Sequence, residues 1–357
     1  MQTEAERNEL PWLIYGATGT TGRLVVESAL AQGQRPIVAG RDGAAVRALA
    51  EQHGLPSAVV SLDDRAGLEA VLRRSSRVLH AAGPFSRTAA SMLDACLATA
   101  TPYLDMSGEV DSVADVLAHD EAARRRKIPL IAGAGFGVTA GDCIAAHVAR
   151  RYPRATRLRI GIDAHNGRRS PGAAVSTLDV LSGGGAWIES GRLVRGPLAH
   201  DRFRATIGER SETFIAAPMA EAVAAFQTTG IANVVAGIPV SPLVASVMRW
   251  VSPILRAVAR RPALRRFVAN RKPSAPETTP LRSRVWALAA DDQGGAASVL
   301  EMGEGYAFAA DAIVLAAQAI GQQPLAGAFT PASAFGPDFV LRIQGVERRD
   351  LTEGEQP

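Results

Sequence analysis

The residues with the clearest chemical meaning form a glycine-rich turn near the start of the 357-residue chain. This turn follows a short apolar run, residues 12–15, and reads Gly16-Ala17-Thr18-Gly19-Thr20-Thr21-Gly22. Its glycines allow a tight bend, close approach of backbone N–H groups to a diphosphate, and close packing of a helix on a strand. The helix predicted from Thr20 directs its first N–H groups and the positive end of its dipole towards such an anion. The pattern predicts a dinucleotide-binding strand, turn and helix.

A basic residue follows the next apolar run. Residues 36–39 are apolar and lead into Gly40 and Arg41. A site for NAD usually carries an acidic residue here, which binds the ribose 2′-hydroxyl. An arginine favours a 2′-phosphate instead, so the sequence predicts NADP as the cofactor. The alternative is an arginine at a strand end that only contacts water.

A regular alternation of apolar runs and helical patterns must position these residues. We expect strands at 12–15, 36–39, 58–62, 77–82, 103–106 and 128–132. Helices are expected at 20–32, 44–53, 65–73, 88–100 and 110–127. Such alternation with short connections predicts a parallel sheet covered by helices on both faces, with ligands bound beyond the carboxyl ends of the strands.

Three later strand ends carry glycine and polar residues. The fourth strand is followed by Ala82-Gly83-Pro84-Phe85, the fifth by 105–109 and the sixth by 133–137. Glycine permits close approach of the backbone to a ligand, although each segment alone could be a simple turn. Together with the glycine-rich turn they favour a cofactor site.

Reduction of a double bond by hydride transfer also requires a group that stabilises the developing charge and a proton donor. The candidates at the strand ends and the domain junction are Tyr103, Asp105, Glu109, Asp142 and His80. Of these, Glu109 could instead cap the following helix, and His80 is expected to be a buried structural histidine. The alternative for Tyr103, a core tyrosine, is favoured over a catalytic one. Two cysteines without a ligand-like spacing indicate neither a disulfide framework nor a metal site.

The pattern changes after residue 138. Residues 158–163 alternate as a strand, short extended pieces follow near Phe203, Thr213 and Val234, and residues 285–289 and 296–302 flank a hairpin turn. A helix is expected at 306–320, with Thr330 and Pro331 as N-cap and first residue of another. The predicted fold is α/β: a Rossmann-type domain at 1–138, an α+β domain with a mainly antiparallel sheet at 139–322, and a C-terminal return to the first domain at 323–357.

Positive charge is concentrated in one segment of a chain whose net charge is +4. No acidic residue lies between Glu221 and Glu277, a stretch with eight basic residues, so nucleic-acid binding is not expected of the chain as a whole. Within 243–270, residues 246–270 predict a basic amphipathic helical segment, broken into two short helices by Pro253 and Pro262. Its apolar face, which includes Val247 and Trp250, either packs on its own domain or contacts a membrane surface or an acidic carrier protein.

The remaining composition is that of an ordinary globular protein. There is no basic-then-apolar leader and no apolar run long enough to span a bilayer, so we expect a cytoplasmic protein, with peripheral membrane contact as a further hypothesis. A homodimer is a possibility that the sequence leaves open.

Three stretches, IYGATGTTGR, AAGPFSRTAASMLDACLATATPYLDMSGE and TPASAFG, resemble the saccharopine dehydrogenase-like oxidoreductases, in particular the branch with trans-acting enoyl reductases. The resemblance implies a Rossmann NADP-binding domain, a second α+β domain, and a site between them. It also implies a role for each matching residue. Residues 16–22 would hold the diphosphate, Arg41 the 2′-phosphate, Gly83 and Pro84 the path to the nicotinamide, and Asp105, Gly108 and Glu109 would lie near the nicotinamide.

The chain departs from that family pattern at two places. Phe85 replaces a frequent tyrosine, and residues 135–142 retain only the last acidic residue, Asp142. The expected function is therefore an NADP(H)-dependent oxidoreductase that reduces a C=C or C=O/C=N bond of a hydrophobic acyl or polyketide-like molecule, either free or carrier-bound. The alternatives are a non-catalytic NADP(H)-binding sensor and an imine-type oxidoreductase for an amino-acid-like substrate.

Overall fold

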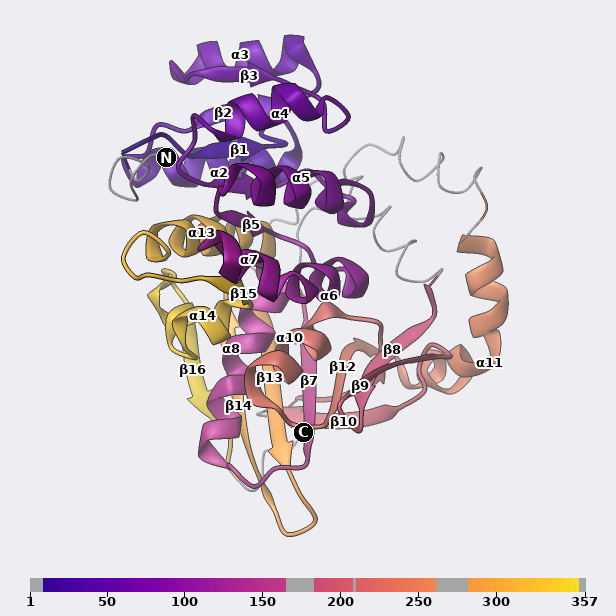
Figure 1. The fold of residues 1–357 in the computed structure, drawn as a ribbon. Coiled ribbons are helices and arrows are strands. Elements are labelled where there is room, and N and C mark those ends of the chain that lie inside the picture. Colours follow the sequence, from indigo (N-terminus) through magenta and orange to yellow (C-terminus); the bar gives the residue numbers. More distant parts are fainter. Residues whose placement is uncertain (1–8, 165–182, 208–209, 260, 262–281, 353–357) are drawn as a thin grey trace. The chain divides into compact units, whose positions relative to one another are not determined.

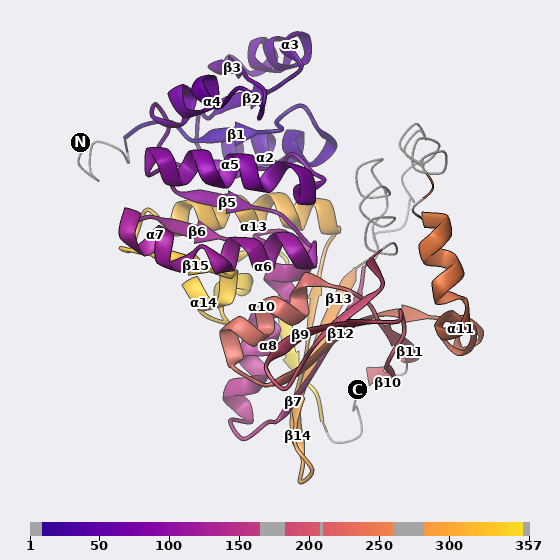
Figure 2. The same ribbon diagram turned by 45° about the vertical axis from the view of Figure 1, so that its right-hand side comes forward.

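The computed structural model describes residues 9–164, 183–207, 210–259, 261 and 282–352. The chain divides into two compact units, each assembled from separate segments. Unit 1 contains residues 1–107, 111–136 and 306–334. Unit 2 contains residues 108–110, 137–305 and 335–357. Figure 1 and Figure 2 show the elements of both units, which are described separately below.

Unit 1 is built on a seven-stranded parallel sheet in the order β15-β6-β5-β4-β1-β2-β3. Its strands are β1 (Leu13–Tyr15), β2 (Ile37–Gly40), β3 (Ser57–Val59), β4 (Val78–His80), β5 (Tyr103–Asp105), β6 (Pro129–Ile131) and β15 (Gly327–Phe329). In the centre, Ile14 aligns with Val38 on one side and Leu79 on the other, and all three side chains are fully buried. Continuous apolar strands of this kind are typical of a sheet covered on both faces.

Helices cover this sheet on both faces (Figure 2). They are α2 (Thr20–Ala31), α3 (Gly43–His53), α4 (Arg65–Leu72), α5 (Phe85–Thr99), α6 (Val110–Ala118), α7 (Asp120–Arg126), α13 (Gly305–Ala319) and α14 (Pro331–Phe335). The single helix predicted at 110–127 is divided at His119, whose ring nitrogen bonds the Asp115 carbonyl oxygen at 2.7 Å. Asp120 and Glu121 then begin α7, where acidic side chains favour a helix N-terminus.

Unit 2 contains a nine-stranded sheet among its described residues, with the path β10-β11-β12-β7-β13-β14-β16 and β8 and β9 joined to β12. Its strands are β7 (Arg157–Asp163), β8 (Gly185–Glu189), β9 (Arg192–Gly196), β10 (Arg202–Ile207), β11 (Arg210–Ala216), β12 (Asn233–Val240), β13 (Ser283–Ala290), β14 (Gly295–Met302) and β16 (Glu347–Asp350). Among the pairings of the described strands of unit 2, only β7–β12 is parallel. The predicted hairpin is the antiparallel pair β13–β14, so the α/β fold with a mainly antiparallel second sheet is confirmed.

Three helices and one 3-10 turn complete the described part of unit 2: α8 (Phe136–Arg151), α10 (Ala220–Thr229), α11 (Pro242–Ala259) and η1 (Phe339–Arg342). Trp286 lies in the hydrophobic core on this sheet, where its indole makes edge contacts with Phe203 and Phe214. Gly161 lies opposite the indole, because a Cβ there would be 2.2 Å from Trp286 Cε2. A glycine in mid-strand thus provides space for the largest core side chain.

The C-terminal segment differs from the predicted return to the first domain. Helix α13 belongs to unit 1, where Ser28 Oγ donates to Asp311 Oδ1 at 2.6 Å and the Arg77 guanidinium donates to the Ala317 carbonyl. Residues 335–357 belong to unit 2, since β16 pairs with β14. The return to unit 1 holds for residues 323–334, but it already begins with α13, so the boundary at 322/323 was wrong. It also ends at residue 334, because β16 pairs with β14 of unit 2.

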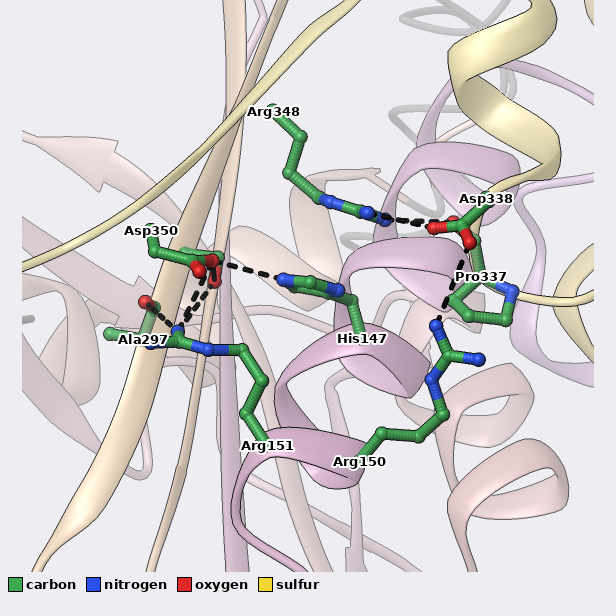
Figure 3. Close-up of polar contacts among 9 residues, drawn as sticks. His147, Arg150, Arg151, Ala297, Pro337, Asp338, Arg348 and Asp350 are labelled. Atoms are coloured by element: carbon green, nitrogen blue, oxygen red, sulfur yellow. Dashed lines mark hydrogen bonds and ion pairs between the residues drawn. The ribbon is translucent and has the colours of Figure 1, made fainter.

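Two carboxylates fix this C-terminal segment to α8 (Figure 3). Asp350 lies 2.9 Å from His147 Nε2 and 3.2 Å from Arg151 Nη1. Asp338 lies 3.7 Å from Arg150 Nη2 of α8 and also accepts from Arg348 of its own segment at 2.7 Å. Burial lowers the pKa of His147 below its ordinary value, although the Asp350 carboxylate opposes this shift. We interpret the cluster as structural, because each charged group contacts a neighbour of the same unit.

Helix α11 is continuous through Pro253, so the prediction of two separate short helices was wrong for residues 242–259. The ribbon changes direction along this helix, and a proline within a helix commonly bends it without ending it (Figure 1). Pro262 and residues 263–270 of the predicted segment lie outside the described residues. Among the described helices, none combines the length and apolar character needed to cross a membrane.

Candidate functional site

The glycine-rich turn lies where the strand order of the parallel sheet reverses. Strand β1 has β2 on one side and β4 on the other, and ligands bind at such switch points in open α/β sheets. Gly16 ends β1 in a left-handed conformation, with φ of +84°. A Cβ on Gly16 would lie 2.7 Å from the Ala82 backbone nitrogen. The turn after β1 and the loop after β4 therefore adjoin each other at the carboxyl edge of the sheet.

The start of α2 is shaped for an anion. A Cβ on Gly22 would lie only 2.1 Å from the Gly16 carbonyl oxygen, so the helix packs directly on the turn. Gly19 is the N-cap and supplies no side-chain hydrogen bond, and the first helical turn contains no acidic residue. Gly19 and Thr20 are exposed, whereas Thr18 and Thr21 are half-buried. The N–H groups of the first turn, which have no intrahelical acceptor, are thus accessible to a diphosphate.

Arg41 follows β2 and is exposed. The preceding Gly40 lies close to the glycine-rich turn, since a Cβ there would be 4.0 Å from Thr18 Oγ1. Asp42 is not available as a ribose ligand in this state, because its Oδ1 accepts the N–H groups of Ala44 and Ala45 at 3.1 Å and caps α3. The carboxyl end of β2 consequently presents an exposed arginine beside the glycine-rich turn, where the diphosphate is expected.

A second cation near Arg41 was missed by the sequence reasoning. The guanidinium nitrogens of Arg47 lie 3.1 and 3.2 Å from the Cβ position of Gly43, the first residue of α3. The Arg47 side chain therefore folds back over the start of α3. This start, Gly43, lies two residues after Arg41 in the chain. The available signal was its i,i+4 spacing from Gly43, which places both on one side of the helix.

The loop after β4 continues the site from Gly16. It comprises Ala82, Gly83, Pro84 and Phe85, and the Gly83–Pro84 peptide bond is cis. Thr88 Oγ1 donates to the Ala82 carbonyl at 2.6 Å and reaches the Pro84 carbonyl at 3.1 Å, which fixes the loop on the first turn of α5. Gly83 is exposed and the Phe85 ring packs beneath it, 3.6 Å from its Cβ position.

Tyr103 and Asp105 are brought together, in a fully buried position. Asp105 Oδ2 accepts the Tyr103 hydroxyl at 2.8 Å, while Oδ1 accepts the N–H groups of Ser107 at 2.9 Å and Gly133 at 2.8 Å. Burial and the Asp105 carboxylate raise the pKa of Tyr103 well above its ordinary value. This geometry ties together the loops after β5 and β6. It favours a supporting role for both residues, and their catalytic role stays a prediction.

His80 is fully buried, as predicted for a structural histidine. Its ring makes edge contacts with Tyr15, Phe85 and Tyr103 at centroid distances of 5.8, 5.4 and 6.0 Å. Burial lowers the pKa of His80 to about 3, which keeps the imidazole neutral at physiological pH. The rings of His80, Tyr15, Phe85 and Tyr103 therefore pack against one another next to the loop after β4, and the neutral imidazole adds no charge there.

The other predicted site residues belong to unit 2. Asp142 is fully buried in α8, and Gly108 is exposed with open space around its Cβ position. Unit 2 also buries Glu221, the second residue of α10, against Gly137 and Gly141 of α8. A Cβ on Gly137 would lie 2.0 Å from Glu221 Oε1. Sequence reasoning missed Glu221, although two glycines at i,i+4 spacing are a signal for close packing.

Comparisons with known proteins agree with the geometry of unit 1. Residues 12–130 match the family described as saccharopine dehydrogenase NADP binding domain. A trans-acting enoyl reductase of Mycobacterium leprae is 29% identical over 154 residues, covering 41% of this chain and 37% of the relative. The same-named protein of Mycobacterium tuberculosis is 32% identical over 113 residues, covering 30% and 27%. The chain thus spans 37% of the length of the first relative and 27% of the second.

Two solved structures resemble nearly the whole chain. Apo saccharopine dehydrogenase (L-Glu forming) from Saccharomyces cerevisiae has a TM-score of 0.63 at 11% identity, covering 96% of this chain and 100% of that one. Homospermidine synthase from Legionella pneumophila in complex with NAD has a TM-score of 0.61 at 11% identity, covering 96% and 92%. At this identity the likeness shows the fold alone. Residues 12–130 therefore match a saccharopine dehydrogenase NADP binding domain, and the chain shares its fold with these two structures.

Proposed function

We propose that the chain is an NADP(H)-dependent oxidoreductase that reduces a C=C or C=O/C=N bond of a hydrophobic acyl or polyketide-like substrate. The observation that carries this proposal is the accessible start of α2, without a side-chain cap, at the strand-order reversal between β1 and β4. A nicotinamide cofactor, when bound, supplies the hydride. The chain's own residues would bind the diphosphate at the start of α2 and orient the dinucleotide along residues 82–85.

The preference for NADP(H) over NAD(H) rests on charge at the end of β2. Arg41 occupies the position at which an acidic residue would bind a 2′-hydroxyl, and Arg47 places a second guanidinium over the start of α3. Two guanidinium groups favour a phosphate by charge-assisted hydrogen bonds, which are stronger than neutral ones. NADPH is therefore expected to bind more tightly than NADH.

The substrate class rests on the curated relatives, which are named trans-acting enoyl reductases. An enoyl substrate offers a C=C bond conjugated to a carbonyl, and reduction places developing charge on the carbonyl oxygen. We therefore rank an enoyl thioester first, and a ketone or imine after it. Whether such a substrate arrives free or attached to a carrier protein is part of the test.

Purified full-length protein should be titrated with NADPH and with NADH, followed by cofactor fluorescence. Oxidation of the bound cofactor should then be measured with a matched panel of a long-chain enoyl thioester, the corresponding ketone and an amino-acid-derived imine. The proposal expects tighter NADPH binding and turnover of the enoyl thioester. Turnover of the imine alone would contradict the proposal and favour an imine-type oxidoreductase for an amino-acid-like substrate. Tight NADPH binding without oxidation of any substrate would favour a redox sensor.

A further inference from the structure

A cleft lies on unit 2 where the sheet meets the start of α11. Its volume is about 380 Å³, within the range of about 300–1,000 Å³ that is typical of small-molecule sites. Its walls come from β10, β11, β12 and the first residues of α11, namely Arg204, Ser211, Glu212, Thr213, Pro239, Val240, Ser241 and Pro242. All of these residues belong to unit 2. The cleft is therefore a feature of one unit of the chain.

The strand register places three of these side chains on one face of the sheet. Arg204 pairs with Thr213, and Thr213 pairs with Val240. Directly paired residues direct their side chains to the same face. Farther along this face, Ile215 packs against Ala245 of α11, which lies beside β10 and β11 (Figure 2). The helix thus covers one part of the face, and the cleft lies in the part that the helix leaves open.

Hydroxyl groups supply hydrogen-bond donors to the cleft. Thr213 is only 9% exposed, and no residue in the described part of the chain forms a hydrogen bond with its hydroxyl. A largely buried hydroxyl without a protein partner favours a ligand that accepts its proton. Ser241 Oγ accepts the Val244 N–H at 3.3 Å, and Ser211 Oγ accepts from Thr206 Oγ1 at 3.3 Å. Each serine therefore keeps its own hydroxyl proton for a ligand.

The charge on this face of the sheet is positive. Arg204 is exposed, and within the described ranges no carboxylate lies at ion-pair distance from its guanidinium. Arg202, two residues earlier in β10, shares this face and adds a second guanidinium. Glu212 also lines the cleft, but it pairs with Ala205, so its side chain lies on the other face, where Oε1 accepts from Arg284 at 3.3 Å. An anion would therefore be attracted to the Arg204 side of the cleft.

We propose that this cleft binds a small organic phosphate ester. The phosphate oxygens would accept from the Arg204 guanidinium and from the three hydroxyl groups. The first turn of α11 contains no acidic residue, so the positive end of the helix dipole would add to the attraction. Pro239, Val240 and Pro242 form an apolar wall that would contact the organic part of the ligand. This inference does not depend on the proposed function.

The donors favour a phosphate over a carboxylate. A phosphate monoester offers three acceptor oxygens and a charge of about −1.5 to −2 at pH 7. A carboxylate has two oxygens and a single charge, so it would leave more of the donors in the cleft without an acceptor. The apolar wall separates an ester from inorganic phosphate, because only the ester has an organic group to place against that wall.

The first test is calorimetric titration of the full chain, in a buffer without phosphate or sulfate, with phenyl phosphate, inorganic phosphate and benzoate. The proposal expects saturable binding of phenyl phosphate and weaker binding of the other two probes. Arg204→Gln should weaken the binding of phenyl phosphate roughly tenfold or more, because a charge-assisted hydrogen bond is lost. Arg192→Gln, at an exposed position of β9, is the matched control and should bind as the unchanged protein does.

A second variant tests the hydroxyl in the cleft. Thr213→Val keeps the shape of the side chain and removes the hydroxyl, so it should weaken binding of phenyl phosphate about threefold to tenfold. Thermal unfolding shows whether each variant is folded, and phenyl phosphate should raise the transition temperature of the unchanged protein more than that of Arg204→Gln. Arg41→Ala should retain full affinity for phenyl phosphate, because Arg41 belongs to unit 1.

Four results would overturn the proposal. The first is the absence of saturable binding of phenyl phosphate at low salt. The second is full affinity in both Arg204→Gln and Thr213→Val. The third is binding of inorganic phosphate or benzoate that is as tight as that of phenyl phosphate, because the site would then not select an ester. The fourth is loss of binding in Arg41→Ala, which would place the probe at the dinucleotide site of unit 1.

Discussion

Gly22 packs so closely on Gly16 that a Cβ at residue 22 would lie 2.1 Å from the Gly16 carbonyl oxygen. A Cβ at Gly16 in turn would lie 2.7 Å from the Ala82 backbone nitrogen. Through these two close contacts, α2 packs on the turn after β1, and that turn packs on the loop after β4. A shift of one of the three segments would therefore displace the others. The proposed position of the diphosphate therefore depends on the absence of a Cβ at both residues.

Gly22→Ala should displace the turn from the start of α2, because the added methyl group meets a backbone carbonyl and not a flexible side chain. We expect the affinity for NADPH and for NADH to fall by similar factors, at least tenfold. Gly303→Ala is the matched control, since a Cβ at Gly303 has no neighbouring atom within 4 Å. Cofactor binding is measured by fluorescence titration. Full affinity in Gly22→Ala would contradict the assigned diphosphate position.

Arg41→Ala should weaken NADPH binding by about 1.5–3 kcal/mol, the range of one charge-assisted hydrogen bond, and should leave NADH binding nearly unchanged. Arg47→Ala is the second variant to measure, because the Arg47 guanidinium lies over the start of α3. Calorimetric titration of both variants with both cofactors separates their contributions. Equal losses of affinity for NADPH and NADH in Arg41→Ala would contradict the assignment of Arg41 as the ligand of the 2′-phosphate.

Tyr103→Phe should lower the free energy of unfolding by about 1.5–3 kcal/mol, because it removes one hydrogen bond to the buried Asp105 carboxylate. We expect kcat/KM to change by less than about threefold if the residue only supports the loops, since its hydroxyl is fully buried. Urea unfolding and steady-state rates measure the two quantities. A hundredfold loss of kcat in a stably folded Tyr103→Phe would establish the alternative, a catalytic hydroxyl.

Asp105→Ala should be more damaging than Tyr103→Phe. It leaves the buried N–H groups of Ser107 and Gly133 without their acceptor, at a cost of roughly 1–3 kcal/mol for each unpaired group. Asp105→Asn retains one oxygen for the two N–H groups and should lose less stability. If Asp105→Ala unfolded at the same urea concentration as the unchanged protein, the network would have no structural role.

Glu221 predicts a pH dependence of stability. Burial raises its pKa from 4.5 to about 7, and Oε2 has no hydrogen-bond partner among the described residues. Between these two values the folded protein binds more protons than the unfolded one, so its stability falls as the pH rises. The contribution is complete below pH 4.5 and is lost as the pH passes about 7, a change of roughly 3 kcal/mol.

The variant Glu221→Gln tests this pH dependence, because it keeps the size of the side chain and removes its titration. It should unfold at higher denaturant concentration than the unchanged protein above pH 7, and the slope of stability against pH between 5 and 7 should become shallower. Glu51→Gln, at an exposed position of α3, is the control and should leave the slope unchanged. An identical slope in Glu221→Gln would show that Glu221 does not titrate in this range.

The sequence by itself determined the parallel sheet and the dinucleotide turn. Both depend on local signals: apolar runs of strand length, glycines at a fixed spacing and a helix that begins directly after them. Thr330 and Pro331 were predicted in the same way, and Ser333 N indeed lies 3.4 Å from Thr330 Oγ1 at the start of α14. Such features require only neighbours in the chain.

Tertiary structure decided what depends on distant residues. Burial of Asp105 follows from Gly133, 28 residues later, and burial of Glu221 follows from Gly137 and Gly141 in another helix. Likewise, β16 joined unit 2 through β14, and the apolar side of α11 stayed exposed because Ala245 and Ser252 pack on the unit instead. A helical pattern shows which residues share a face. Which face becomes buried depends on the other elements of the folded chain that pack against it.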